Sequence, residues 1–193
     1  MDVILASTLL VTFAEIGDKT MLLAIVLAVR FRRPVPIIVG IFVATIINHA
    51  LAAWAGAAIA GLLEGWWFRF AVAMGFIAMA AWTLVPDSID EDEANGESGV
   101  GGTARGAFVT TTVAFFAAEM GDKTQVATIA LGAQYQAVML VAIGTTLGMM
   151  LANVPAVFLG ERMTRLVPLH WMRIAAALLF AVLGLWALWD LLA

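Results

Sequence analysis

The chain has 193 residues, of which 63% are hydrophobic and only 12% are charged, whereas charged residues make up about 25% of a soluble domain. This composition excludes an ordinary soluble protein and predicts an integral membrane protein, with length for about six spans of roughly 20 residues each. The net charge of −4 comes mainly from one acidic segment, and the absence of cysteine excludes disulfides and thiolate metal sites.

Hydrophobic runs predict six membrane-crossing helices, each long enough to cross with some tilt. In chain order, the predicted spans cover residues 3–29, 35–60, 67–85, 106–131, 137–159 and 174–192. The first span carries charged residues and no basic segment precedes it, so it is expected to stay in the mature protein rather than act as a removable signal. The predicted fold is therefore all-α.

An acidic and glycine-rich segment separates the third span from the fourth. Its composition is typical of a solvated linker and lacks the spacing of an EF-hand calcium loop. Its acidic residues are Asp87, Asp90, Glu91, Asp92, Glu93 and Glu97, and the glycines that follow are Gly99, Gly101 and Gly102. We expect three parts: a three-helix repeat over residues 1–85, a linker over 86–105 and a second three-helix repeat over 106–193.

The two halves repeat with a constant offset of 104 residues. The hexapeptide Glu-Ile-Gly-Asp-Lys-Thr begins at Glu15, and Glu-Met-Gly-Asp-Lys-Thr begins at Glu119. The same offset pairs Gly40 with Gly144, Trp67 with Trp171, Arg69 with Arg173, and Trp82 with Trp186. One register that continues through three helices indicates an internal duplication.

Arginines set the predicted orientation. Those assigned to the first, third and fifth loops are Arg30, Arg32, Arg33, Arg105, Arg162, Arg165 and Arg173. The positive-inside rule places these loops, including the acidic linker, in the cytoplasm and both termini outside a plasma (inner) membrane. Loop arginines change sides between the halves, as at Arg30 and its counterpart Gln134. The halves are therefore expected to be inverted repeats with a binding site near the midplane.

Each hexapeptide places two carboxylates and an ammonium at bilayer depth, where one charge costs about 2.5 to 3.5 kcal/mol on insertion scales. On a continuous helix, the Glu and Asp would share one face and the Glu could pair with the Lys. Gly17 and Gly121 allow either close helix approach or a local break that exposes carbonyl oxygens. Ion pairs that merely lock helices together are the alternative, but duplication at one depth favours a binding site.

Together, the two hexapeptides supply four carboxylates and two lysines, a formal charge of −2 that one divalent cation or two protons would balance. The carboxylates, the hydroxyls of Thr20 and Thr124, and nearby amides are hard oxygen ligands suited to Ca²⁺, Mn²⁺ or Mg²⁺. The amides belong to Gln125, Asn48 and Asn153. Burial disfavours the charged carboxylate, so an empty site would take up protons. Competition between cation and protons is the simplest antiport mechanism.

Three polar residues in the second and fifth spans are expected to lie near this site. The gap-free register sets His49 opposite Asn153, while a shift of one residue pairs Asn48 with Asn153. The asparagines are expected to support the site or to hydrogen-bond between helices. His49 is expected to satisfy packing neighbours rather than to bind the ion.

The twin Glu-x-Gly-Asp-(Lys/Arg)-(Thr/Ser) motifs, three helices apart around an acidic loop, resemble those of the manganese/calcium cation–proton exchanger family. This family includes Golgi ion transporters of eukaryotes and manganese exporters of bacteria, and the resemblance covers essentially the whole chain. It implies that a cation site is formed by Glu15, Asp18, Glu119 and Asp122, supported by Lys19, Thr20, Lys123 and Thr124. Gln125 follows the second motif but Met21 follows the first, so the halves are expected to coordinate unequally.

The predicted function is export of a divalent cation from the cytoplasm in exchange for protons, with no tightly bound cofactor and no nucleic-acid partner. The resemblance favours Mn²⁺ first and Ca²⁺ second, an order that the ligands alone do not give. An exporter of a small cationic metabolite such as lysine is the alternative, and a non-transporting assembly factor is another. An intramembrane enzyme is not expected, because His49 and His170 are far apart in sequence and no catalytic motif occurs.

Overall fold

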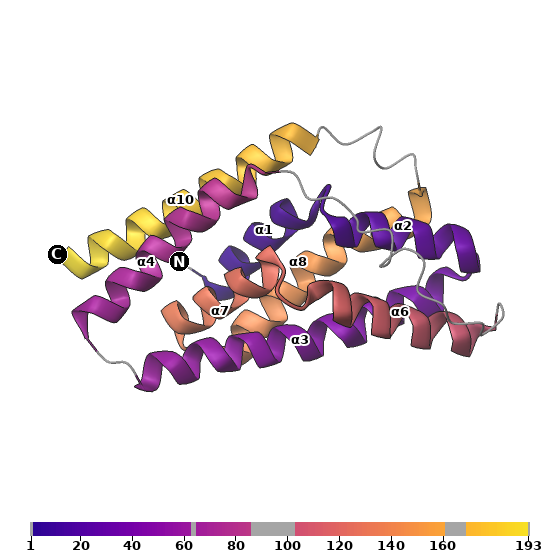
Figure 1. Cartoon of the computed structure of the whole chain (residues 1–193), viewed down its shortest axis with the longest axis horizontal. Helices are drawn as coiled ribbons and strands as arrows, with labels where there is room; N and C mark the ends of the chain where they lie inside the picture. The colour runs from indigo at the N-terminus through magenta and orange to yellow at the C-terminus, as the bar shows by residue number, and fades with distance from the viewer. Residues whose placement is uncertain (1, 63–64, 86–102, 161–168, 193) are drawn as a thin grey trace.

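The structure is all-helical, and two of the six predicted spans are broken. The computed structural model describes residues 2–62, 65–85, 103–160 and 169–192, which form eight helices and no strand (Figure 1). In chain order, the helices are α1 (Val3–Glu15), α2 (Lys19–Phe31), α3 (Pro34–Leu62), α4 (Trp66–Thr83), α6 (Ala104–Glu119), α7 (Lys123–Tyr135), α8 (Val138–Leu159) and α10 (Leu169–Leu192). The acidic residues of the predicted linker, with Arg162 and Arg165, lie outside the described residues.

Within the described part of the chain, four helices are long and apolar enough to cross a membrane, namely α3, α4, α8 and α10. They correspond to the second, third, fifth and sixth predicted spans. The prediction of continuous helices over residues 3–29 and 106–131 is wrong, because α1 and α2 divide the first and α6 and α7 divide the second. Each break falls inside a hexapeptide.

Glycine permits both breaks. Gly17 has a φ of 90° and Gly121 has a φ of 80°, a left-handed conformation that glycine adopts without steric cost and that no α-helix contains. The second half of each broken span also ends in the same way, with a non-glycine residue in the left-handed region. These residues are Arg32 (φ 53°) after α2 and Gln136 (φ 50°) after α7, again 104 residues apart. The two broken spans therefore share their local structure.

The main helix contacts join one half of the chain to the other. α1 and α2 pack on α8, α6 and α7 pack on α3, and α4 lies along α10 (Figure 1). A Cβ atom at Gly40 would lie 2.9 Å from Cβ of Thr111 in α6, and one at Gly144 would lie 2.8 Å from Cβ of Ser7 in α1. Both members of these pairs are related by the offset of 104 residues. Equivalent glycines thus allow equivalent helices to approach closely.

The α4–α10 pair packs unequally on the rest of the molecule. α10 contacts α1 and α4 contacts α7, whereas among the described residues neither α10 with α2 nor α4 with α6 forms a comparable contact. Figure 1 shows the pair lying over the end of the molecule that contains α1 and α7, with α2 and α6 at the other end. This asymmetry distinguishes the two ends of the helix bundle.

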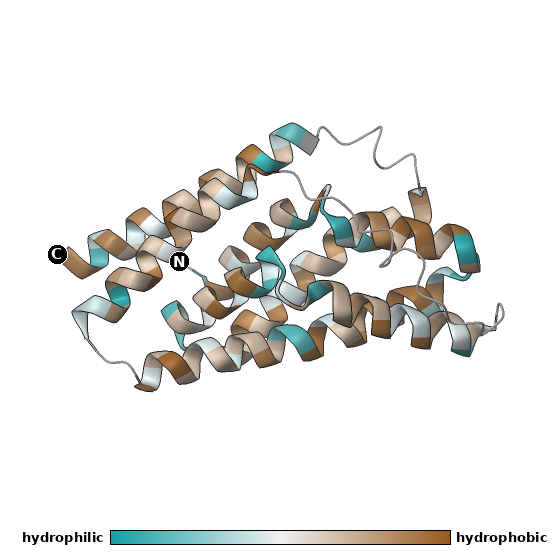
Figure 2. Cartoon of the chain, in the orientation of Figure 1, coloured by the Kyte–Doolittle hydropathy of each residue, from teal (hydrophilic) through white to brown (hydrophobic). Residues whose placement is uncertain are grey.

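Polar and apolar residues are distributed as a lipid environment requires. Large apolar side chains are exposed, including Leu62 at 82% and Trp67 at 77%. Among the described residues, every buried Asp, Glu and Lys side chain lies where α1 meets α2 or where α6 meets α7, and hydrophilic colour appears on the ribbon at both places (Figure 2). Buried charge is costly, so these breaks are where a function is expected.

Candidate cation site

The two breaks bury all four acidic residues of the hexapeptides. Glu15 is the last residue of α1 and Asp18 is the N-cap of α2, while Glu119 and Asp122 hold the same positions at the end of α6 and the start of α7. None is more than 7% exposed. The expectation that Glu and Asp share one helical face is wrong, because the chain leaves the helix between them.

Three of these acids, one pair from the first half and one residue from the second, form a compact cluster. Glu15, Asp18 and Asp122 each place one carboxylate oxygen within 4.8 Å of the others. Oxygen ligands of Ca²⁺ lie about 2.3 to 2.6 Å from the ion, so two ligands of one ion are at most about 5 Å apart. The three oxygens therefore lie close enough together to bind a single ion.

Hydroxyl groups hold the cluster. Thr20 donates a hydrogen bond to Oε2 of Glu15. Thr124 donates one to Oδ2 of Asp122, at 3.2 Å. Oε1 of Glu15 is buried and has no hydrogen-bond partner among the described residues. Both threonines thus contact the acids, as the sequence predicts, and leave one oxygen of Glu15 available.

Glu119 lies apart from the three-acid cluster. Its Oε2 atom is 3.1 Å from Nε2 of His49, and both side chains are fully buried. Glu119 is still near enough for its charge to act on Glu15. The structure therefore brings together three of the four predicted ligands and pairs the fourth with a histidine that was expected only to satisfy packing neighbours.

The three predicted amides have different partners. Gln125 donates to Oδ1 of Asn48 at 2.5 Å, and its own Oε1 accepts from the backbone N–H of Gly121 at 2.7 Å. This chain of bonds ties the second break to α3. Asn153 instead donates to the backbone oxygen of Met149 in its own helix at 3.1 Å. Among the described residues, Asn153 therefore makes no hydrogen bond to either motif.

The two lysines begin the second halves of the broken spans. Lys123 is buried, and its Nζ donates to the backbone oxygen of Val85 at 2.7 Å and lies 5.9 Å from the ring centroid of Trp82. Lys19 is partly exposed. Because α2 and α7 start at these lysines, the positive ends of both helix dipoles adjoin Asp18 and Asp122. The helix ends thus help to stabilise carboxylates that burial would otherwise disfavour.

A small pocket reaches the first break from the side of α4 and α10. Its lining includes Asp18, Lys123, Val85 and Arg173. Arg173 was assigned to a loop, but the structure places it in α10 beside this pocket. The only signal in the sequence was its pairing with Arg69 at the 104-residue offset.

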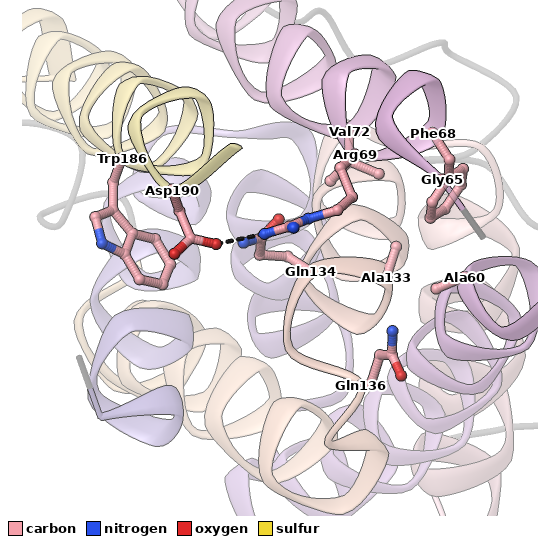
Figure 3. Close-up of a pocket in the computed structure, with 10 residues that line it drawn as sticks. All are labelled: Ala60, Gly65, Phe68, Arg69, Val72, Ala133, Gln134, Gln136, Trp186 and Asp190. Atoms are coloured by element: carbon pink, nitrogen blue, oxygen red, sulfur yellow. Dashed lines mark hydrogen bonds and ion pairs between the residues drawn. The ribbon is translucent and has the colours of Figure 1, made fainter. Parts of the chain in front are cut away.

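A second and larger pocket, of about 480 Å³, lies at the other ends of α4 and α10. Arg69 of α4 and Asp190 of α10 point toward one another across it, with 2.5 Å between Nη2 and Oδ2 (Figure 3). Gln134, Gln136 and Trp186 complete its polar wall. This pocket contains none of the hexapeptide residues.

Comparisons with known proteins agree with one another. A family model described as "Divalent cation/proton antiporter GDT1" matches residues 3–91 and 107–193. A protein of Vibrio cholerae serotype O1 named "Putative manganese exporter" is 47% identical over 186 residues, which cover 96% of this chain and 90% of the relative. No solved structure matches the chain. The chain belongs to the divalent cation/proton antiporter family.

Proposed function

We propose that the protein exports Mn²⁺ from the cytoplasm in exchange for protons across the plasma membrane. Membership of an antiporter family makes the chain a transporter rather than an enzyme. In the proposed arrangement, the broken spans also cross the membrane, which gives six crossings in two inverted repeats, residues 1–85 and 106–193. The equivalent breaks, the shared helix ends and the paired glycine contacts support this arrangement.

The observation that carries the proposal is the cluster of Glu15, Asp18 and Asp122, since two distant breaks bring three buried carboxylates within 4.8 Å. Three buried carboxylates this close together disfavour one another's charged form, and a bound cation or protons would offset that repulsion. Glu119 is the proposed fourth ligand, because its buried Oε1 has no hydrogen-bond partner among the described residues. A cation and protons that compete for the same oxygens would exchange across the membrane.

Mn²⁺ is the proposed ion because the relative from Vibrio cholerae carries the name of a manganese exporter. The oxygen ligands at the breaks suit hard divalent cations, with Ca²⁺ the second choice. A compact cluster within 4.8 Å suits a small ion better than the ammonium group of an amino acid, which would bring a bulky side chain with it.

The packing of α4 and α10 supports access from the cytoplasm. The predicted orientation places α1 and α7 in the outer half of the membrane, where the α4–α10 pair packs on them. The pocket beside Asp18 lies at the opposite ends of the same pair, next to Val85 and Arg173, and its volume of about 10 Å³ has room for about one water molecule. Release to the outside would then require α10 to pack on α2 and α4 on α6, which is the same packing with the repeats exchanged.

The experiment that tests this function is cation uptake into inside-out vesicles that contain the protein. A panel of Mn²⁺, Ca²⁺, Mg²⁺ and Zn²⁺ is tested with and without a pH gradient, and lysine is added as a competitor. We expect Mn²⁺ uptake that a proton gradient drives and that lysine does not inhibit.

Uptake of Ca²⁺ alone would mean that the transported ion is Ca²⁺ rather than Mn²⁺, and would leave the mechanism of proton exchange unchanged. Inhibition by lysine would favour a metabolite exporter, and uptake that ignores the pH gradient would exclude proton exchange. Vesicles without the protein provide the background for all three measurements.

A further inference from the structure

The glutamates of the two hexapeptides have the same pattern of hydrogen bonding. In each carboxylate, Oε2 is held by a side chain, while Oε1 is buried with no hydrogen-bond partner among the described residues. Thr20 holds Glu15, and His49 holds Glu119 at 3.1 Å. The second oxygen of each glutamate is thus oriented and open to a ligand.

The repeat alone would assign a different partner to Glu119. Thr124 is the counterpart of Thr20, but its hydroxyl donates to Oδ2 of Asp122 instead, at 3.2 Å. The place that Thr20 holds in the first half is therefore taken by His49, which comes from α3 rather than from the hexapeptide.

Among the described residues, the first half has no equivalent of this contact. The residue that corresponds to His49 is Asn153, and its amide bonds the backbone oxygen of Met149 within α8. Adjacent to His49, Asn48 accepts a bond from Gln125, which in turn binds the N–H of Gly121. Two consecutive residues of α3 therefore hold both sides of the second break, one on Glu119 and one on the start of α7.

We propose that His49 is a positioning residue for the cation site, acting through Glu119. With the cation bound, Glu119 would be ionised and could only accept hydrogen bonds. In that state Nε2 of His49 would donate to Oε2 and leave Oε1 for the ion. This inference depends on the proposed function. Partners that orient ligating groups typically change metal affinity or activity by about 10- to 100-fold when they are removed.

The test replaces His49 in purified protein and in proteoliposomes. His49→Leu removes the donor, His49→Asn shortens the side chain to that of its counterpart Asn153, and His49→Gln keeps an amide N–H that can reach Glu119. We expect His49→Leu and His49→Asn to raise the half-saturating Mn²⁺ concentration about 10- to 100-fold, with a smaller change in the maximal rate. His49→Gln should restore most of the affinity.

Calorimetric titration of the detergent-purified protein with Mn²⁺ measures the same change without transport. Thr145→Val is the matched control, since Thr145 is a buried hydroxyl that bonds only carbonyl oxygens of its own helix in the contacts described, at Val141 and Ala142. It should leave Mn²⁺ affinity unchanged. In a Glu119→Gln background, His49→Asn should cause no further loss, because the carboxylate on which it acts is gone.

Two results would overturn the proposal: an unchanged half-saturating Mn²⁺ concentration in His49→Asn, or a defect in His49→Gln as large as in His49→Asn. If His49→Leu does not fold, the comparison of the Asn and Gln variants decides, since both keep a polar side chain. Wild-type protein that neither binds nor transports Mn²⁺ would instead refute the proposed function.

Discussion

Asparagine in place of Asp122 separates the charge of the site from its structural role. Oδ1 of Asp122 accepts a hydrogen bond from the backbone N–H of Lys123 at 2.7 Å and so caps α7. Asparagine caps helices about as well as aspartate. The variant should therefore fold and insert, and should lose only one of the three negative charges of the cluster.

The size of the effect follows from the geometry of the cluster. An ion bound between oxygens that lie within 4.8 Å of one another is closer than that to each of them. At 4 Å and an effective dielectric constant of about 20, two unit charges interact by about 4 kcal/mol. The interaction of a carboxylate with a divalent ion is larger, but rearrangement of the remaining ligands in the variant would offset part of its loss. A loss of about 4 kcal/mol weakens binding about 1,000-fold.

The assay is calorimetric titration of Asp122→Asn with Mn²⁺, together with Mn²⁺ uptake into inside-out vesicles. Asp2→Asn is the matched control, because Asp2 also caps a helix, through a 2.9 Å bond from the N–H of Ile4, but is exposed and lies at the opposite end of α1 from Glu15. Its Mn²⁺ affinity should equal that of the wild type. An Asp122→Asn protein that binds Mn²⁺ within about threefold of the wild type would refute the assignment of this cluster as the cation site.

Three further substitutions and one control test the fold. Gly121→Ala should destabilise the protein by about 1 to 2 kcal/mol in a thermal unfolding assay, because its φ of 80° is left-handed, although an added Cβ would meet open space. Gly75→Ala is the control: its Cβ would also meet open space, but within helix α4, so the change should be neutral or stabilising. Gly56→Ala should lower the free energy of unfolding by about 1 to 3 kcal/mol and reduce the yield of folded protein, because its Cβ would lie 2.0 Å from a backbone oxygen of α7. A yield equal to that of the wild type would contradict the contact of α3 with α7. Asp190→Asn should change stability by less than about 1 kcal/mol, since Arg69 and Asp190 are both more than half exposed, and a larger shift in the thermal unfolding of the variant would show a stronger pair.

Much of the architecture could be predicted, because the lengths of the hydrophobic runs and the constant offset between the two halves can be read directly from the sequence. The 104-residue offset that links Glu15 to Glu119 also relates the glycine contacts at Gly40 and Gly144. The burial of all four acids followed from their position in apolar runs. The sequence left two roles open for the glycine of each hexapeptide: a break in the helix, which uses its positive φ, or close packing of two helices. Local sequence does not choose between these roles, because glycine permits both.

The unequal partners of the two glutamates could not be predicted from the repeat. The hexapeptides match at every defined position, yet Thr20 bonds Glu15 while Thr124 turns to Asp122. The difference arises in α3, where His49 stands opposite Asn153 in the register and is within reach of Glu119 only after the helices pack. A tertiary contact of this kind leaves no periodic pattern in a single sequence.

The crossed packing of the halves has a consequence for how the chain folds. Each broken span lies on an unbroken helix of the other half, α1 and α2 on α8, and α6 and α7 on α3. A short isolated helix is only marginally stable. The two short helices of each broken span therefore depend on packing against a long helix of the other half. We therefore expect that the two halves are not independent folding units. The first half should complete its fold only after the second has been synthesised, and the separately expressed halves should be stable only together.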